Sequence, residues 1–274
     1  MNSTETFLQI LTEYLDKFTN LAAKYDGTIQ YSKELETTID GYSAFITDER
    51  NHSAWEQLER QASNEFIRLA AEARSVSARC VAIMEKYRAL KLLDGNAGLT
   101  DYFKNIESCI ESEFGSFHVT SDSKVFMVGS GSFPMTPLLI AKRTGAEVIG
   151  IDIDDEAVEL GRRVVERLGG GLRIRLVNSS IDHLDLKNVS HIIFSSTVPN
   201  KYDMLEQLHP LTEERVVVAM RYGDRLKSLF NYPMKETDGQ TWGLVETVLR
   251  PGHVFDVALY KKVSVASGQR RRFT

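Results

Sequence analysis

The strongest constraint on the fold is an apolar run that leads into a glycine-rich turn, followed by a second apolar run that ends on an acid. The first run is 124–128, the turn is Gly129-Ser130-Gly131, and the second run is 147–151. Adjacent parallel strands bring such a turn beside the acid. There the backbone can approach a ligand, and the carboxylate can accept hydrogen bonds from a ribose diol. The pattern predicts a crevice for an adenosine-containing cofactor. Its predicted binding residues are Gly129, Ser130, Gly131, Asp152 and Ile153.

Composition favours a globular enzyme with one sizeable core and a smaller second lobe, because 274 residues with 42% hydrophobic and 26% charged side chains are ordinary for that class. The net charge of −5 disfavours a nucleic-acid partner. No apolar stretch reaches the roughly 18 residues of a membrane helix, and the N-terminus has no apolar signal-peptide centre. Cys80 and Cys109 lack metal-ligand spacing. We expect a cytoplasmic protein without a membrane partner or a bound metal.

The spacing of apolar residues divides the chain into two halves. Up to about residue 115 it is helical, as in the stripe Leu8, Leu11, Leu15 and Phe18, and predicts four or five helices without a strand. From about residue 122, short apolar strands alternate with amphipathic segments, which predicts a doubly wound parallel sheet and an α/β fold. We therefore expect a helical lobe over 1–118 and a Rossmann-like domain over 119–274. The predicted strands are 124–128, 147–151, 173–177, 191–195 and 216–220.

The last two predicted strands, 242–249 and 253–263, are joined by a short turn and predict an antiparallel hairpin. A terminal hairpin on a parallel sheet is typical of methyltransferase-type folds. The third glycine of the dinucleotide fingerprint is replaced by Met135, and Pro134 lacks an N–H for a phosphate. S-adenosylmethionine, which has no phosphate, is therefore favoured over NAD. A fold that has lost its ligand remains an alternative.

Polar residues end three of the predicted strands. Ser180 and Ser195 are further candidates for cofactor contact, although each could instead be a helix cap or a loop residue. Asp152 could cap the following helix, but Asp154 is better placed for that role because it directly precedes an acidic first turn.

Longer motifs show that residues 8–263 resemble a known enzyme family. The chain resembles the nicotianamine synthase-like enzymes of bacteria, and in particular the staphylopine-type histidine 2-aminobutanoyltransferases of opine metallophore synthesis. The matching segments are 80–95, 102–107, 128–131, 150–154, 192–197, 218–223 and 230–233.

The resemblance implies a helical lobe that lies over the Rossmann-like domain, on the acceptor side, and closes as a lid. It also implies transfer of the 3-amino-3-carboxypropyl group of S-adenosylmethionine to the α-amine of histidine, with D-histidine favoured and methylthioadenosine released. A separate opine dehydrogenase would act next, and a homodimer is compatible with such a two-lobe enzyme. Three alternatives stay open: a small-molecule methyltransferase, a nicotianamine synthase proper and a non-catalytic binding protein.

Two residues are predicted to be catalytic. Glu85 lies in a strip of small apolar residues on its helix, which favours a partly desolvated carboxylate with a raised pKa, suited to a general base. The resemblance places a functional glutamate at this position and a functional tyrosine at Tyr102. The alternatives are a surface glutamate paired with Arg88 or Lys91, and a packing tyrosine.

Two further residues are predicted to bind substrate. Arg221 ends the fifth strand and could hold a carboxylate by a two-pronged contact, or could instead pair with Asp224 or Glu246. Tyr232 precedes a proline near the same crevice and could line it, or could be a buried aromatic residue.

Overall fold

The computed structural model describes residues 3–95 and 113–263. The N-terminal half is helical, as predicted, and the structure assigns no strand to residues 3–95. The predicted break at Asp26-Gly27 falls between the first two helices. The elements of this half are α1 (Ser3–Ala23), α2 (Ser32–Thr47), the short 3-10 helix η1 (Glu49–Asn51), α3 (His52–Gln61) and α4 (Asn64–Leu93).

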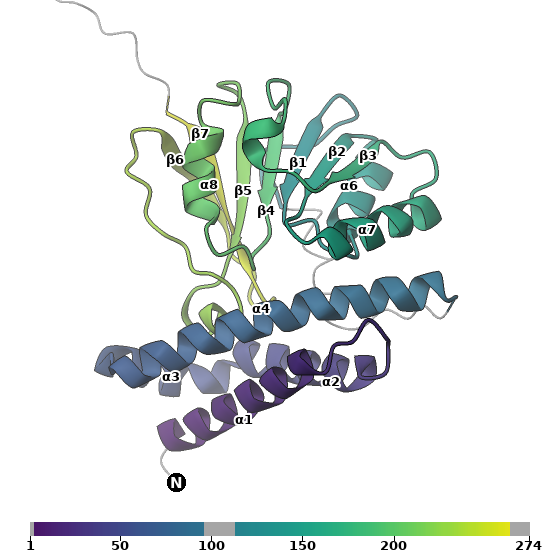
Figure 1. Cartoon of the computed structure of the whole chain (residues 1–274). Helices are drawn as coiled ribbons and strands as arrows, with labels where there is room; N and C mark the ends of the chain where they lie inside the picture. The colour runs from purple at the N-terminus through teal and green to yellow at the C-terminus, as the bar shows by residue number, and fades with distance from the viewer. Residues whose placement is uncertain (1–2, 96–112, 264–274) are drawn as a thin grey trace, which may run out of the picture.

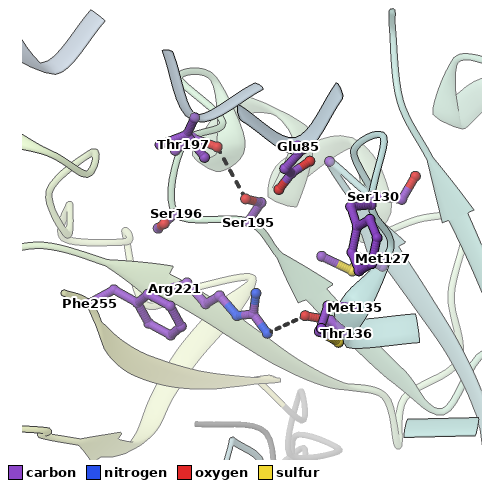
Figure 2. Close-up of a pocket in the computed structure, with 13 residues that line it drawn as sticks. Glu85, Met127, Ser130, Met135, Thr136, Ser195, Ser196, Thr197, Arg221 and Phe255 are labelled. Atoms are coloured by element: carbon purple, nitrogen blue, oxygen red, sulfur yellow. Dashed lines mark hydrogen bonds between the residues drawn. The ribbon is translucent and has the colours of Figure 1, made fainter. Parts of the chain in front are cut away.

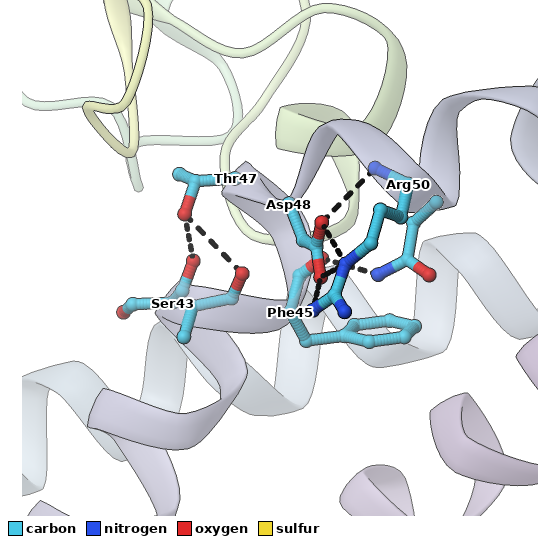
Figure 3. Close-up of polar contacts among 7 residues, drawn as sticks. Ser43, Phe45, Thr47, Asp48 and Arg50 are labelled. Carbon is cyan, nitrogen blue, oxygen red and sulfur yellow. Dashed lines mark hydrogen bonds and ion pairs between the residues drawn. The ribbon is translucent and has the colours of Figure 1, made fainter.

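A polar cluster ends α2 and starts η1, as Figure 3 shows. The Thr47 hydroxyl donates to the Ser43 carbonyl at 2.8 Å. Asp48 accepts from the Arg50 backbone N–H at 3.0 Å and pairs with the Arg50 guanidinium at 2.6 Å. Because the Arg50 side chain is 89% exposed, the ion pair contributes little to stability, and the backbone contact sets the turn into α3.

Helix α4 spans 30 residues and links the two halves. It begins where the Ser63 hydroxyl accepts from the Phe66 N–H at 3.2 Å, an N-cap that satisfies one of the helix's open donors. Figure 1 shows α4 crossing beneath the sheet, with α1, α2 and α3 on its other side. One face of α4 therefore packs on helices and the other meets the loops of the sheet.

The C-terminal half is a seven-stranded sheet in the order β3-β2-β1-β4-β5-β7-β6. The first five strands are parallel, and β7 runs antiparallel to both β5 and β6. The strands are β1 (Lys124–Val128), β2 (Glu147–Ile151), β3 (Ile174–Val177), β4 (His191–Phe194), β5 (Val217–Tyr222), β6 (Trp242–Val248) and β7 (Asp256–Lys262). Between them lie α6 (Met135–Thr144), α7 (Asp155–Leu168), η3 (Ile181–His183), α8 (Lys201–Leu208) and η4 (Arg225–Leu229).

The predicted fold class is confirmed: an α/β protein with a doubly wound sheet, a terminal hairpin and an N-terminal helical bundle. The hairpin does not simply extend the sheet, because β7 inserts between β5 and β6. Strand order reverses between β1 and β4, and in open α/β sheets such a switch point opens a crevice at the carboxyl ends of the strands.

The two halves share one hydrophobic core. Phe18 and Tyr42 of the helical half belong to the same buried cluster as Val125 and Met127 of β1. The Tyr42 hydroxyl, fully buried, donates to the Leu229 carbonyl of η4 at 2.9 Å. The division at residues 118 and 119 stays a prediction, since side chains from both sides of it pack together. Over 3–95 and 113–263, none of the helices is both long and apolar enough to cross a bilayer.

Candidate active site

A pocket opens at the carboxyl ends of β1, β4 and β5, against α4 (Figure 2). It brings together five of the residues predicted from sequence: Glu85, Gly129, Ser130, Ser195 and Arg221. The complete lining is Val81, Glu85, Met127, Gly129, Ser130, Phe133, Met135, Thr136, Ser195, Ser196, Thr197, Arg221 and Phe255.

The glycine turn is tied to the end of β2. The Gly131 N–H donates to the Asp152 carboxylate at 2.9 Å, and the same carboxylate accepts from the Asp154 N–H at 3.1 Å. Asp154, not Asp152, caps α7, accepting from the Ala157 N–H at 3.2 Å. The Asp152 side chain therefore orders the loop at the switch point, and its neighbour Ile153 stands 94% exposed beside it.

Glu85 reaches from α4 onto the glycine turn. Its carboxylate accepts from the Ser132 N–H at 3.2 Å. Gly131 has a φ of +68°, and a Cβ there would lie 1.8 Å from the Glu85 Oε2 atom. Any side chain at position 131 would thus be strained and would displace the carboxylate. The turn and the helix fit together only with glycine at that position.

Burial raises the pKa of Glu85 to about 8, and the negative charge of Asp152 adds to the effect. Of the two surface partners considered for Glu85, Arg88 acts on it through its charge and favours the ionised carboxylate, whereas Lys91 is engaged elsewhere. Lys91 pairs with Glu36 at 3.4 Å, and the Arg88 guanidinium lies 4.4 Å from the centre of the Phe133 ring. The strip of small residues on α4 thus places the Glu85 carboxyl in a poorly solvated position next to the glycine turn.

Lys86, the next residue of α4, joins the same helix to the start of α7. Its ammonium pairs with Asp154 at 2.7 Å and with Glu156 at 2.6 Å. The Tyr25 hydroxyl, from the segment after α1, also donates to Glu156 at 2.6 Å. Two consecutive residues of α4 therefore contact the loops that follow β1 and β2.

Arg221 forms a buried ion pair that the sequence did not indicate. Its guanidinium contacts both carboxylate oxygens of Glu113, at 2.5 and 2.7 Å, and donates to the Thr136 hydroxyl at 2.9 Å. It also lies 5.0 Å from the centre of the Phe255 ring. The partner is Glu113 and not Asp224 or Glu246. Figure 2 shows the guanidinium directed at Thr136, with Ser195 between it and Glu85 in this view.

Comparison with known proteins gives two kinds of relative, although no protein-family model matches the chain. In sequence, the chain is 26% identical over 232 residues to an L-histidine 2-aminobutanoyltransferase of Pseudomonas aeruginosa, covering 83% of this chain and 86% of the relative. It is 29% identical over 177 residues to an L-histidine 2-aminobutanoyltransferase of Yersinia pestis, covering 65% and 66%.

In structure, the chain matches the nicotianamine synthase MtNAS in complex with MTA and tNA, with a TM-score of 0.73 and 15% identity over 94% of this chain and 98% of the other. A glutamate-to-glutamine variant of MtNAS with S-adenosylmethionine gives a TM-score of 0.70 at 16% identity, covering 91% and 98%. The resemblance to nicotianamine synthase-like enzymes is confirmed. At these identities the structural match establishes the fold alone.

The other residues predicted from sequence lie at varying distances from this pocket. Ser195 lines it, with its hydroxyl 3.2 Å from that of Thr197. The Ser180 hydroxyl is 3.2 Å from His183 Nδ1, and Ser180 does not line the pocket. Tyr232 is also outside the lining, and its ring lies 5.6 Å from the Arg74 guanidinium. Tyr102 lies outside the described residues.

Sequence reasoning missed four residues of this region: Glu113, Thr136, Lys201 and Phe255. Thr136 lies in the first turn of α6, the helix that follows the glycine turn, so its place in the motif was a usable signal. The other three come from segments far from that motif, and no local pattern marks them. Among residues 3–95 and 113–263, the structure contains no group of three or more His, Cys, Asp or Glu side chains that could hold a metal ion.

Proposed function

We propose that this protein transfers the 3-amino-3-carboxypropyl group of S-adenosylmethionine to the α-amine of histidine and releases methylthioadenosine. The relatives that match most of its length are named for histidine aminobutanoyl transfer. The observation that carries the proposal is Glu85, a carboxyl with a pKa raised to about 8 in the same pocket as the glycine turn and Arg221. A small-molecule methyltransferase remains the alternative.

The loops after β1 and β2 fit the nucleoside of S-adenosylmethionine. Asp152 already accepts two backbone N–H groups, so it is held where its oxygens can also accept from the ribose hydroxyls. Ile153 offers an exposed apolar surface to the adenine ring. Gly129 and Ser130 line the pocket, where the main chain can approach the amino-acid arm. We propose Gly129, Ser130, Gly131, Asp152, Ile153, Ser180 and Ser195 as the cofactor-binding residues.

Glu85 is the proposed general base. The α-amine of an amino acid is largely protonated at neutral pH, with a pKa of about 8 in peptides, and only its neutral form is a nucleophile. A carboxyl whose pKa is close to 8 is mostly protonated at neutral pH, and its ionised fraction, about one tenth, is a base strong enough to accept that proton. Since burial disfavours the ionised carboxylate, the site itself favours Glu85 taking up the proton from the substrate.

The bond changes balance without a further reactant. The histidine nitrogen bonds to the methylene of the 3-amino-3-carboxypropyl group that is attached to sulfur. The bond between that carbon and sulfur breaks, and its electron pair remains on sulfur. The positive sulfonium thereby becomes the neutral thioether methylthioadenosine, and the proton of the amine goes to Glu85. Which of the three sulfonium carbons reacts depends on which one is held in line with the nitrogen. The way the pocket positions the sulfonium therefore decides whether the 3-amino-3-carboxypropyl group or the methyl group is transferred.

Arg221 and Tyr232 are the proposed substrate-binding residues. Arg221 lines the pocket, and the Glu113 pair and Thr136 fix the orientation of its guanidinium. A guanidinium held in this way can bind the carboxylate of the arm or of histidine. Tyr102 is kept as a proposed catalytic residue on the resemblance alone. We also retain the helical lobe as an acceptor-side lid.

The acceptor enantiomer is the part of the proposal most in need of a test. The resemblance in sequence favours D-histidine, whereas the relatives from Pseudomonas and Yersinia are named for L-histidine. A downstream opine dehydrogenase, a homodimer and a cytoplasmic location complete the proposal.

The deciding experiment incubates the purified protein with S-adenosylmethionine and either D- or L-histidine, and identifies the products by mass spectrometry. We expect methylthioadenosine together with histidine carrying one aminobutanoyl unit, from one enantiomer. Release of S-adenosylhomocysteine would instead assign the protein to the methyltransferases. Formation of a product with two or more aminobutanoyl units and no histidine would indicate a nicotianamine synthase.

A further inference from the structure

Lys201, the first residue of α8, is the most unusual buried charge near the pocket. Its side chain is fully buried, with 0% exposure. Its ammonium donates to the Arg221 carbonyl at 2.6 Å and to the Tyr232 carbonyl at 3.0 Å. Among the residues that the structure describes, no carboxylate forms an ion pair with it. Burial, with a further contribution from Arg74, lowers the pKa of Lys201 to about 7.

Burying a lysine with no carboxylate bonded to it costs free energy, and the negative charge of Asp224 offsets only part of that cost. The hydrogen bonds that Lys201 makes must therefore contribute something that an apolar side chain would not. Both of its acceptors are main-chain carbonyls, and both belong to segments beside the pocket. A leucine or methionine would fill the same space without that cost. The position of the two carbonyls that accept from Lys201 therefore indicates the role of its side chain.

The two carbonyls lie at the centre of a small main-chain network. The Tyr232 carbonyl also accepts from the Gly223 N–H at 3.2 Å, and the Tyr232 N–H donates to the Ser196 carbonyl at 3.0 Å. The backbone at Tyr232 thus bridges the end of β4 to the segment that follows β5. Lys201 bonds to the Tyr232 carbonyl of this bridge and to the Arg221 carbonyl at the end of β5. These strand ends supply Ser195, Ser196, Thr197 and Arg221 to the pocket.

We propose that Lys201 is a positioning residue that fixes the ends of β4 and β5 relative to each other and so shapes the acceptor side of the pocket. The inference builds on the proposed histidine transfer. Lys201 does not line the pocket, so it acts through the main chain and not by touching substrate. The glycine turn and Asp152 are outside its network, which makes the expected effect selective for the acceptor.

The test compares Lys201→Met with Lys262→Met. Lys262 is a matched control because it is also buried, has a pKa lowered by burial, and donates to a main-chain carbonyl, that of Thr212, at the other end of β7 from the pocket residue Phe255. For each variant, kcat and KM for histidine are measured by methylthioadenosine release, and the Kd for S-adenosylmethionine by calorimetry. Hydrogen exchange reports protection of the Gly223 and Tyr232 amides.

For Lys201→Met we expect kcat/KM for histidine to fall about tenfold or more, because small misplacements of a reacting group are costly, with Kd for S-adenosylmethionine within about threefold of wild type. Its Gly223 and Tyr232 amides should exchange faster, whereas those of Lys262→Met should not. Equal losses of kcat/KM in the two variants, or unchanged kinetics in Lys201→Met, would overturn the proposal.

The proposal can still be tested in two cases where the first experiment fails. If Lys201→Met does not fold, Lys201→Gln keeps an N–H donor on a shorter side chain and should show the same selective loss to a smaller degree. If the wild-type protein releases no methylthioadenosine with histidine, the proposed function fails, and hydrogen exchange alone decides on Lys201. Retained protection of the Gly223 and Tyr232 amides in Lys201→Met would then refute its positioning role.

Discussion

The two sides of the pocket are built in different ways. The wall proposed to bind the cofactor, called here the cofactor wall (residues 129–132 and 152–153), is held by a contact between Gly131 and Asp152, which are 21 residues apart in the loops that follow the adjacent parallel strands β1 and β2. The wall proposed to bind the acceptor, called here the acceptor wall (residues 196, 197, 221 and 255), depends on Arg221 bonding to Glu113, 108 residues away. Compact local sequence builds the first wall, whereas distant segments must meet to build the second.

This difference separates what the fold guarantees from what the particular chain adds. A nucleoside crevice follows from two strands and a glycine turn, so many proteins with this fold share it. The acceptor wall is assembled from buried charges that need one another, so its shape can differ between relatives of the same fold. Variants should therefore affect the two walls separately, and Glu85, which lies between them, should affect the reaction itself.

The largest effect is expected for Glu85→Gln. Turnover should fall by about a hundredfold or more because the amide cannot accept the proton of the amine, while S-adenosylmethionine still binds. Methylthioadenosine release and calorimetric binding measure the two properties. Glu72→Gln, on an exposed face of the same helix, is the control and should keep wild-type turnover. Loss of cofactor binding together with turnover would assign Glu85 to the cofactor wall instead.

Arg221→Met should damage the acceptor wall. It leaves Glu113 buried without its partner, and breaking a buried pair in this way costs about 3–5 kcal/mol of unfolding free energy. The double variant Arg221→Met with Glu113→Met removes both charges and should recover much of that loss, as measured by urea unfolding. If Arg221 binds a substrate carboxylate, kcat/KM stays low in the double variant. Recovery of kcat/KM together with stability would show that Arg221 is structural only.

The pH dependence of stability tests the environment of Glu85 between the walls. Its native pKa of about 8 lies above the value of 4.5 for an exposed glutamate, so between these values the native state holds a proton that the unfolded chain has lost. The stabilisation that Glu85 contributes is thus fully present below about pH 4.5. Above that pH the free energy of unfolding falls by roughly 1.4 kcal/mol per pH unit, up to about pH 8. Urea unfolding should show that slope in wild type and in Glu72→Gln but not in Glu85→Gln. Equal slopes in all three would contradict the raised pKa.

The smallest effect is expected for Ile153→Ala on the cofactor wall. Because the side chain is 94% exposed, its loss should leave the melting temperature unchanged. Lost contact with adenine should weaken S-adenosylmethionine binding by about three- to tenfold, the value of a partly covered apolar side chain. Leu168→Ala, another exposed apolar residue, is the control for general surface effects. A stability loss without weaker binding would remove Ile153 from the site.

The sequence was sufficient for the fold class and for the strands that flank the glycine turn, but it did not give the order of the strands in the sheet. Strand periodicity located β1 and β2 and predicted that the glycine turn and Asp152 would lie at one crevice, but the hydrogen bond between Gly131 and Asp152, at 2.9 Å, is visible only in the structure. The small residues of α4 indicated a desolvated Glu85, but not the loop it touches. Glu113, Lys201 and Phe255 could not be found, because their meeting depends on tertiary packing across long separations that no local pattern encodes.

The insertion of β7 between β5 and β6 has a consequence for how the protein is made. Because β7 follows all other strands in the chain, β5 has no neighbour on that side until residues 256–262 emerge from the ribosome. The nucleoside crevice can form earlier, since β1 to β4 and α4 precede it. During synthesis the chain therefore passes through a state with an exposed β5 edge and no Phe255 in place, and such unpaired edges are sites of aggregation. Chaperone dependence should accordingly concentrate in the last stage of translation.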